Sequence, residues 1–175
     1  YTTANTLSLH DALPISVTPE LAEALRRFVA AGGGLVLAAD QNVRAEEWND
    51  LLGRSRLLPA PLERLRSEKG GGEVFRSLSR AAVGAGPLGA FETGEDGDLA
   101  AARFYCWWEL GEAGEGVDVL ARFDDRGPFL LRRRGELGSV LLLAGGLNGW
   151  WNNLVAREFY VPLVYRLLGE AAAGG

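Results

Sequence analysis

The chain has 175 residues, 47% of them hydrophobic, and a formal net charge of −5 at pH 7. This length and composition predict one soluble domain with one hydrophobic core. The acidic balance, without any basic cluster interleaved with aromatic residues, argues against nucleic-acid binding. A single cysteine and a single histidine exclude a disulfide scaffold and a zinc site. No apolar run approaches the roughly 18 residues that a membrane-spanning helix needs.

Residues 1–16 differ in composition from the rest of the chain, because they contain the one histidine, His10, and no arginine. The run SLHDALPIS, which ends at Ser16, resembles translated sequencing-adapter read-through. We therefore interpret residues 1–16 as a non-native segment and residues 17–175 as the domain. The alternative is a true amino-terminal strand and turn. Because methionine is absent even at position 1, we expect the chain to be a fragment of a longer protein.

The first predicted element is a helix that begins at Thr18-Pro19-Glu20, since threonine can cap, proline suits the first helical position and glutamate favours the positive helix end. Glycines 32–34 end this helix and lead into the apolar run 35–39, which is typical of a parallel strand buried on both faces. A short helix is predicted over 45–52. The apolar stripe of the first helix, expected to face a core, comprises Leu21, Leu25, Phe28 and Val29.

From residue 53 to about 99 the periodicity weakens, and we predict a partly irregular excursion. The aromatic-rich segment 103–110 suits a strand. Three further strands joined by short turns then form a meander over 117–145, and the last of them is apolar enough to be central. A closing helix is predicted over about 157–171. Its expected buried stripe comprises Val161, Val164, Tyr165 and Leu168.

Two segments carry a resemblance to a known family. The first joins LAEALRRFVAAGGGLVLAAD, from Leu21, to AEEWNDLL, and the second runs from Val119 to Leu168 and includes LNGWWNNLVAREFYVPLVYRLL. Together they resemble the glutamine-amidotransferase-like domain of bacterial proteins with a BatA-type membrane anchor and often a von Willebrand factor A domain. The resemblance covers most of residues 17–171, with the middle poorly matched. It implies a three-layer α/β fold, flavodoxin-like or class I amidotransferase-like, with a mostly parallel sheet and an antiparallel meander.

The residues themselves argue against amidotransferase catalysis. That chemistry needs a cysteine nucleophile at a glycine-flanked turn and a histidine base that a carboxylate orients. Cys106 lies instead in the aromatic run 104–108, which favours a small buried residue. In catalytic relatives the histidine follows the last core strand, where this chain has residues 145–148, GGLN. We therefore predict no catalytic residue and no enzyme.

Polar and aromatic residues follow the two strands predicted to be buried. Asp40 and Gln41 come after the first strand, and Asn148, Trp150 and Trp151 come after the second. Ligands of open α/β sheets bind outside the carboxyl ends of the strands, so we predict that these five residues form a binding site. The alternative is that they only terminate strands and cap the final helix.

Other clusters have plainer interpretations. Carboxylates at Asp124-Asp125 and within 95–98 are possible cation ligands, but the first pair suits a hairpin turn and the second lacks the closing glutamate of a calcium loop. We therefore predict no metal and no cofactor. Of the tryptophan pairs 107–108 and 150–151, we expect core packing to bury one member of each, and the other is a candidate for contact with a sugar or a partner surface, with burial as the alternative.

The leading functional hypothesis is a non-catalytic interaction or assembly domain of a membrane-anchored bacterial protein. Its expected partners are other protein domains of the parent chain or complex, with no nucleic acid, and with membrane contact only through segments absent from this fragment. The domain itself is expected to be soluble and extracytoplasmic. The alternative is a small-molecule-binding or carbohydrate-binding domain, and a residual hydrolase that uses Cys106 or a carboxylate pair is a third hypothesis.

Overall fold

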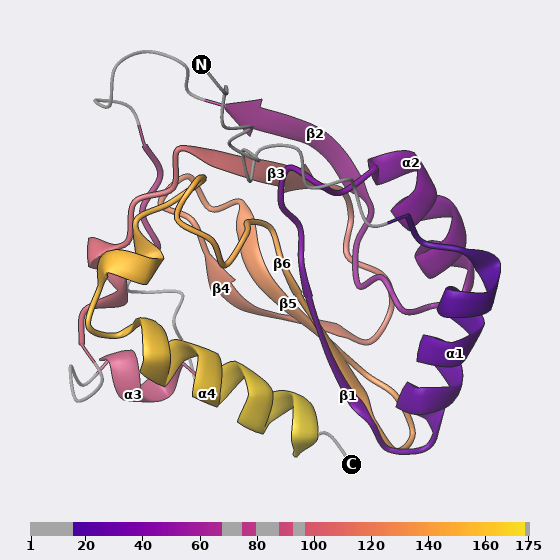
Figure 1. Ribbon diagram of the computed structural model, residues 1–175. Helices are drawn as coiled ribbons and strands as arrows, with labels where there is room; N and C mark the ends of the chain where they lie inside the picture. Colours follow the sequence, from indigo (N-terminus) through magenta and orange to yellow (C-terminus); the bar gives the residue numbers. More distant parts are fainter. Residues whose placement is uncertain (1–15, 68–74, 80–87, 93–96, 174–175) are drawn as a thin grey trace, which may run out of the picture.

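The computed structural model describes residues 16–67, 75–79, 88–92 and 97–173. Helices lie on both sides of a central β-sheet, and a second, smaller sheet lies at one end of it (Figure 1). Most of the segment interpreted as non-native, and Glu95 and Asp96 of the second carboxylate cluster, lie outside the described residues. The elements in chain order are α1 (Pro19–Ala30), β1 (Gly34–Ala38), α2 (Ala45–Glu47) with a π-helical turn (Trp48–Leu52), β2 (Leu62–Ser67), α3 (Gly89–Glu92), a 3₁₀ turn (Leu99–Ala101), β3 (Cys106–Leu110), β4 (Val117–Arg122), β5 (Pro128–Arg134), β6 (Ser139–Leu143), a 3₁₀ turn (Leu154–Ala156) and α4 (Tyr160–Ala172).

The central sheet has the strand order β1-β6-β5-β4. β1 and β6 are parallel, with Gly34 opposite Ser139 and Ala38 opposite Leu143. The pairs β6–β5 and β5–β4 are antiparallel. The prediction of a mostly parallel, flavodoxin-like or amidotransferase-like sheet is therefore wrong. The reason is that the short turns at 124–127 and 135–138 join β4, β5 and β6, and such turns can connect only antiparallel neighbours.

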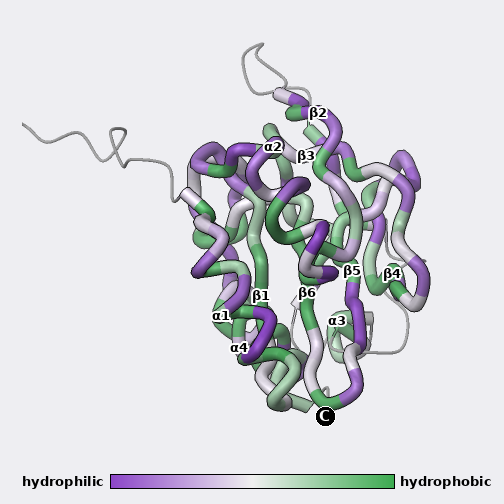
Figure 2. Tube along the Cα trace, turned by 90° about the vertical axis from the view of Figure 1, so that its right-hand side faces the viewer, coloured by the Kyte–Doolittle hydropathy of each residue, from purple (hydrophilic) through white to green (hydrophobic). Residues whose placement is uncertain are grey.

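Apolar side chains cover both faces of the central sheet. Along β6, Leu141 and Leu143 lie in the core on the α4 side, and Val140 and Leu142 lie in the core on the α1 side. Every residue of β6 is buried, and Figure 2 shows β1 and β6 as hydrophobic stretches. The uninterrupted apolar run thus correctly indicated burial on both faces. It contains no information about the direction of the neighbouring strands.

The connection from α1 into β1 forms as its sequence predicts. The Thr18 hydroxyl accepts a hydrogen bond from the Leu21 amide at 3.2 Å, which caps the helix. Gly32 has a φ of +97°, a left-handed conformation that favours glycine. Gly34 is needed for another reason, because a Cβ there would lie 2.2 Å from the backbone of Ala171 in α4. The turn therefore allows α4 to pack directly on the first residue of β1.

The small sheet pairs β2 with β3 in antiparallel fashion. β3 is close to the predicted strand at 103–110, whereas β2 lies within the segment predicted to be irregular. The sequence of β2, LERLRS, buries only Leu62, so it lacks the apolar content expected of a strand. Its partner β3 supplies the apolar residues, and both Trp107 and Trp108 are buried. Neither of these two tryptophans is therefore available for a sugar or a partner surface.

The buried faces of the two long helices match the predicted stripes only in part: on α1, Val29 is buried and Leu25 packs against the core as predicted, whereas no stripe residue of α4 is among its buried residues. Ala22 and Val29 are the buried residues of α1, and Leu163, Leu167 and Ala171 are those of α4. Each helix also has an apolar flank next to its buried face, and most of that flank is exposed. The exposed flank residues are Leu21 and Phe28 on α1 and Val161, Tyr165 and Leu168 on α4. None of the described helices combines the length and the apolar character required to cross a membrane.

Candidate functional site

The loops that follow β1 and β6 meet beyond the carboxyl ends of these two strands. The side-chain amide of Asn148 donates to Asp40 Oδ2 at 3.2 Å. The backbone amide of Trp150 in turn donates to Asn148 Oδ1 at 3.0 Å. Parallel pairing of β1 and β6 explains this meeting, because it brings both carboxyl ends to the same edge of the sheet. A chain of hydrogen bonds therefore joins Asp40, Asn148 and Trp150.

Close backbone approach holds the two loops together. A Cβ at Gly146 would lie 2.9 Å from both the Asp40 Cβ and the Asn148 Nδ2, so a larger residue would push the loops apart. The Trp108 indole N–H donates to the Asp40 carbonyl at 3.4 Å, which ties the first loop to the small sheet. On the other side, the Tyr160 hydroxyl donates to the Leu147 carbonyl at 2.8 Å. Both loops are thus anchored to elements outside the central sheet.

The two tryptophans of the β6 loop have different environments. Trp151 is 5% exposed and packs in a small core with Ala39, Leu62 and Trp108. Trp150 is 58% exposed. Buried Asn152 fixes the loop after them, since its side-chain amide donates to the Gly146 carbonyl at 2.6 Å. Trp151 therefore has a structural role, and Trp150 presents its indole at the surface.

We name Asp40, Gln41, Asn148 and Trp150 the crest site. Asp40 accepts hydrogen bonds on both carboxylate oxygens, from the Asn42 amide and from Asn148, and each oxygen has a second lone pair available. Gln41 is exposed and lies next to Asp40 in the chain. The crest site thus combines an exposed aromatic side chain with carboxylate and amide groups. Such a set can stack against an apolar ring face and exchange hydrogen bonds with hydroxyl groups.

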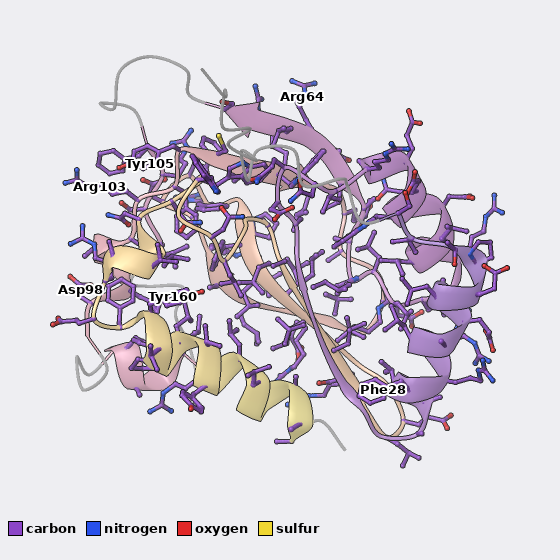
Figure 3. The ribbon with its side chains drawn as sticks, in the orientation of Figure 1. Phe28, Arg64, Asp98, Arg103, Tyr105 and Tyr160 are labelled. Carbon is purple, nitrogen blue, oxygen red and sulfur yellow. The ribbon has the colours of Figure 1, made fainter. Side chains whose placement is uncertain are left out.

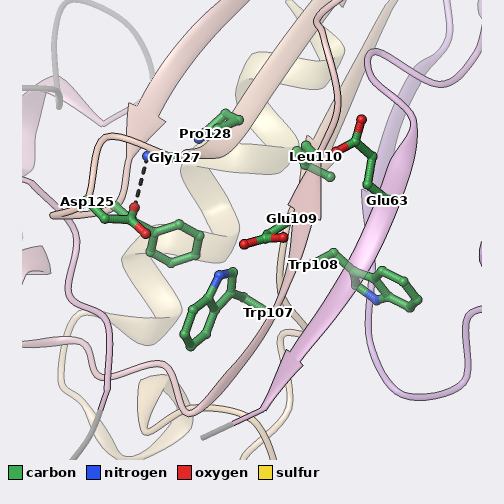
Figure 4. Close-up of a pocket in the computed structure, with 9 residues that line it drawn as sticks. Glu63, Trp107, Trp108, Glu109, Leu110, Asp125, Gly127 and Pro128 are labelled. Atoms are coloured by element: carbon green, nitrogen blue, oxygen red, sulfur yellow. Dashed lines mark hydrogen bonds between the residues drawn. The ribbon is translucent and has the colours of Figure 1, made fainter.

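A separate pocket of about 230 Å³ lies between β3 and the β4–β5 turn (Figure 4). Trp107, Glu109 and Asp125 point toward one another there, and Glu63 of β2 lies at the rim. Two of its three carboxylates have cationic partners: Arg66 contacts Glu109 at 2.6 Å, and Arg76 contacts Asp125 at 3.3 Å. Sequence reasoning missed this pocket because its lining comes from β3 and from the β4–β5 turn, which are distant in the chain, and from β2, which was not predicted. The sequence of β2 has no alternation of apolar and polar residues, and residues 63–67 are all exposed, so it contains no signal for a strand.

The remaining chemical candidates have structural surroundings. Cys106 in β3 is half-buried, and its thiol donates to the Ser67 hydroxyl at 3.4 Å. Asp124 and Asp125 lie in the hairpin turn, where the Asp125 carboxylate accepts from the Gly127 amide at 2.9 Å. Within the part of the chain that the structure describes, no three His, Cys, Asp or Glu residues are grouped closely enough to hold a metal ion.

No protein-family model matches this chain, and no curated protein matches it. Solved structures do share its fold. A cytoplasmic protein from Salmonella typhimurium aligns with a TM-score of 0.65 at 16% identity, over 89% of this chain and 61% of that protein. An exo-β-1,4-mannosidase from Opitutaceae bacterium strain TAV5 aligns with a TM-score of 0.55 at 16% identity, over 85% of this chain. A β-galactosidase from Bacillus circulans sp. alkalophilus also aligns with a TM-score of 0.55 at 16% identity, over 88% of this chain.

The chain spans 23% of the mannosidase and 21% of the β-galactosidase. At 16% identity the alignments show a shared fold, and two of the proteins that contain this fold are glycosidases. The resemblance to amidotransferase-like domains of BatA-type proteins is not addressed by any of these matches and stays a prediction.

Proposed function

We propose that this chain is a non-catalytic carbohydrate-binding domain and that the crest site is where the sugar binds. The observation that carries the proposal is Trp150, a residue 58% exposed whose backbone amide donates a hydrogen bond to the Asn148 side chain. Exposing a tryptophan forfeits the free energy of burying a large apolar side chain. A fixed loop around it is consistent with a binding role for the exposed ring.

The chemistry of the crest site suits a sugar. A pyranose ring presents a face of C–H groups that packs against an aromatic ring, and its hydroxyls exchange hydrogen bonds with carboxylates and amides. Asp40 and Gln41 lie on the β1 loop, and the Asp40–Asn148 hydrogen bond brings that loop to the loop of Trp150. Two proteins with the same fold are named as a mannosidase and a β-galactosidase, which supports a carbohydrate-related role.

The residues of the crest site support sugar binding without catalysis. The polar groups of the crest site are one carboxylate and two amides, whereas glycoside hydrolysis requires a pair of carboxyl groups on either side of the scissile bond. One stacking tryptophan on an open surface gives modest affinity. We expect a dissociation constant on the order of 0.1–1 mM, which corresponds to roughly −5.5 to −4.1 kcal/mol.

The test is a calorimetric titration of the whole chain with β-1,4-mannotetraose and, separately, with a β-1,4-linked galactobiose. Trp150→Ala is expected to weaken binding about tenfold or more, and Trp150→Phe to retain part of it, because a smaller aromatic ring can still stack. Tyr165→Ala is the matched control, since Tyr165 is another surface-exposed aromatic residue and lies on α4, away from the crest site.

Thermal unfolding accompanies each titration, and the exposure of Trp150 predicts an unchanged Tm for Trp150→Ala. Lost binding at an unchanged Tm supports the proposal. The proposal would be contradicted if neither sugar binds at several millimolar, or if Trp150→Ala and Tyr165→Ala weaken sugar binding equally.

A further inference from the structure

A depression of about 200 Å³ lies between α1, the segment that follows the π-helical turn, and the β5–β6 turn. Val29 and Leu57 contribute apolar side chains to its lining. Arg26 and Arg56 contribute positive charge, and Glu136 is the one carboxylate among the described lining residues. Glu136 precedes β6, whereas the loop of the crest site follows β6, so the depression lies at the opposite end of the central sheet.

Arg133 of β5 points to the α1 side of the sheet, the side on which the depression lies. It stands opposite Val140 of β6, whose side chain belongs to the core on that side. The Arg133 guanidinium rests on Gly114, where a Cβ would collide with Arg133 Nη2. The Gly114 amide donates to the Pro59 carbonyl at 3.1 Å. Arg133 therefore lies beside the segment of the chain that carries Arg56.

Arg56 and Arg133, which we name the arginine pair, are two like charges near one another. Burial lowers the pKa of Arg133, and the positive charge of Arg56 lowers it further. The Nε atom of Arg133 is buried and has no hydrogen-bond partner among the described residues. A buried charged donor without an acceptor is unfavourable. An oxyanion between the two guanidinium groups would accept hydrogen bonds from both and cancel their repulsion.

Other arginines on the surface of the described chain have acidic partners. Arg54, two residues before Arg56, contacts Asp50 at 2.6 Å. Arg64 extends outward from β2 and contacts Glu109 at 4.0 Å (Figure 3). Acidic residues outnumber basic ones in the whole chain by 23 to 18. Nevertheless, no ion pair joins either member of the arginine pair to a described carboxylate, so the pair differs from these surface arginines.

We propose that the arginine pair binds the phosphate group of a small organic phosphate, whose apolar body lies in the depression. Guanidinium groups bind phosphate oxygens through charge-assisted hydrogen bonds, often two at a time. Two neighbouring cations match the charge of a phosphate monoester at neutral pH, which is close to −2. Val29 and Leu57 favour a ligand with an apolar body over an inorganic ion. The site is distinct from the crest site, so either proposal can fail alone.

The probe is phenyl phosphate, titrated into the whole chain at neutral pH in a phosphate-free buffer. Inorganic phosphate and benzoate are separate arms of the same experiment. At ten times its dissociation constant, phenyl phosphate is expected to raise the folding equilibrium constant about elevenfold in urea unfolding. It is also expected to shift the Nε–H resonance of Arg133 in a nitrogen–proton correlation spectrum, which Arg133→Met assigns. The other two anions should bind more weakly, because inorganic phosphate lacks the apolar body and benzoate carries less charge.

Arg56→Gly and Arg133→Met remove the two guanidinium groups. Arg56 has a φ of +55°, which glycine adopts without strain, so Arg56→Gly is expected to keep the fold. Arg133→Met replaces a partly buried charge by an apolar side chain and is also expected to keep it. Each variant should weaken phenyl phosphate binding about tenfold or more. Arg126→Gly is the matched control, since Arg126 is another exposed arginine with a positive φ, +73°, but lies in the β4–β5 turn.

Three results would overturn the proposal. The first is an Arg133 Nε–H resonance that phenyl phosphate leaves unchanged at several millimolar. The second is equal binding of phenyl phosphate by Arg56→Gly and Arg126→Gly, because Arg56 would then make no specific contribution. The third is inorganic phosphate or benzoate binding as tightly as phenyl phosphate, because the apolar body or the second charge would then play no part in recognition.

Discussion

Replacing Gly34 by alanine tests how closely α4 is seated on β1. The added Cβ would lie 2.2 Å from the carbonyl carbon and oxygen of Ala171 and 2.8 Å from the Ala172 amide nitrogen. Non-bonded carbon atoms rest about 3.5–4.0 Å apart, so α4 has to move away by more than about 1 Å. A gap of that size forfeits roughly a quarter to a half of the dispersion energy of the affected contacts. Leu163 and Leu167, which lie on the same buried face, would lose packing with it.

We therefore expect Gly34→Ala to destabilise the fold by about 3 kcal/mol, the upper part of the usual range for overpacking. For a domain of this size the Tm then falls by roughly 6–12 °C. Gly53→Ala is the matched control, because a Cβ there has no described atom within 4 Å and the backbone is helical, with φ −63° and ψ −50°. It is expected to stabilise by about 0.4–1 kcal/mol. Thermal unfolding by circular dichroism measures both, and an unchanged Tm in Gly34→Ala would refute the reasoning about α4.

Three further predictions concern single side chains. Thr18→Ala removes the cap of α1 and is expected to cost about 1 kcal/mol in urea unfolding, with Thr18→Ser retaining most of the stability. Burial acts to lower the pKa of Arg132, but its hydrogen bonds to Asp118 and Glu170 outweigh burial and raise it. Arg132→Met leaves Glu170 without its partner and should therefore lower the free energy of unfolding by roughly 1–3 kcal/mol. A neutral result would show that the pair contributes nothing to stability. The hydrogen bond from Arg26 lowers the pKa of Glu23, so the ionised carboxylate stabilises the fold above its ordinary pKa of 4.5 and this contribution is lost as the pH falls through the lowered value. Glu23→Gln should make the Tm fall less steeply between about pH 5 and pH 3, and identical slopes would contradict this.

Local signals predicted the local elements well. The Thr18 cap, the glycine turn at residues 32–34 and the hairpin turn at Asp124-Asp125 each depend on a few adjacent residues, and all three are present. β2 was missed because its stability comes from a partner 40 or so residues away in the chain, and its own sequence is mostly exposed and charged. The expectation of a mostly parallel sheet came from the family resemblance and was wrong, because the short turns of the meander pair β4, β5 and β6 antiparallel.

The site residues were predicted from a rule that needs only one parallel pair of strands. β1 and β6 supply that pair, so Asp40 and Asn148 meet although most of the sheet is antiparallel. Which tryptophan faces solvent was beyond sequence reasoning. Trp107 and Trp108 are both buried because each face of β3 packs on a different apolar cluster, Trp107 with the main core and Trp108 with Ala39, Leu62 and Trp151.

The most direct test of the carbohydrate-binding proposal is the indole N–H region of a nitrogen–proton correlation spectrum, recorded during titration with β-1,4-mannotetraose. The chain has five tryptophans, and each indole gives its own resonance, which single substitutions can assign. We predict that the Trp150 resonance shifts with sugar concentration and that those of Trp107, Trp108 and Trp151 do not, because these three are buried. A shift centred on Trp107, beside the pocket at the β4–β5 turn, or no shift in any indole at several millimolar sugar, would contradict the proposal.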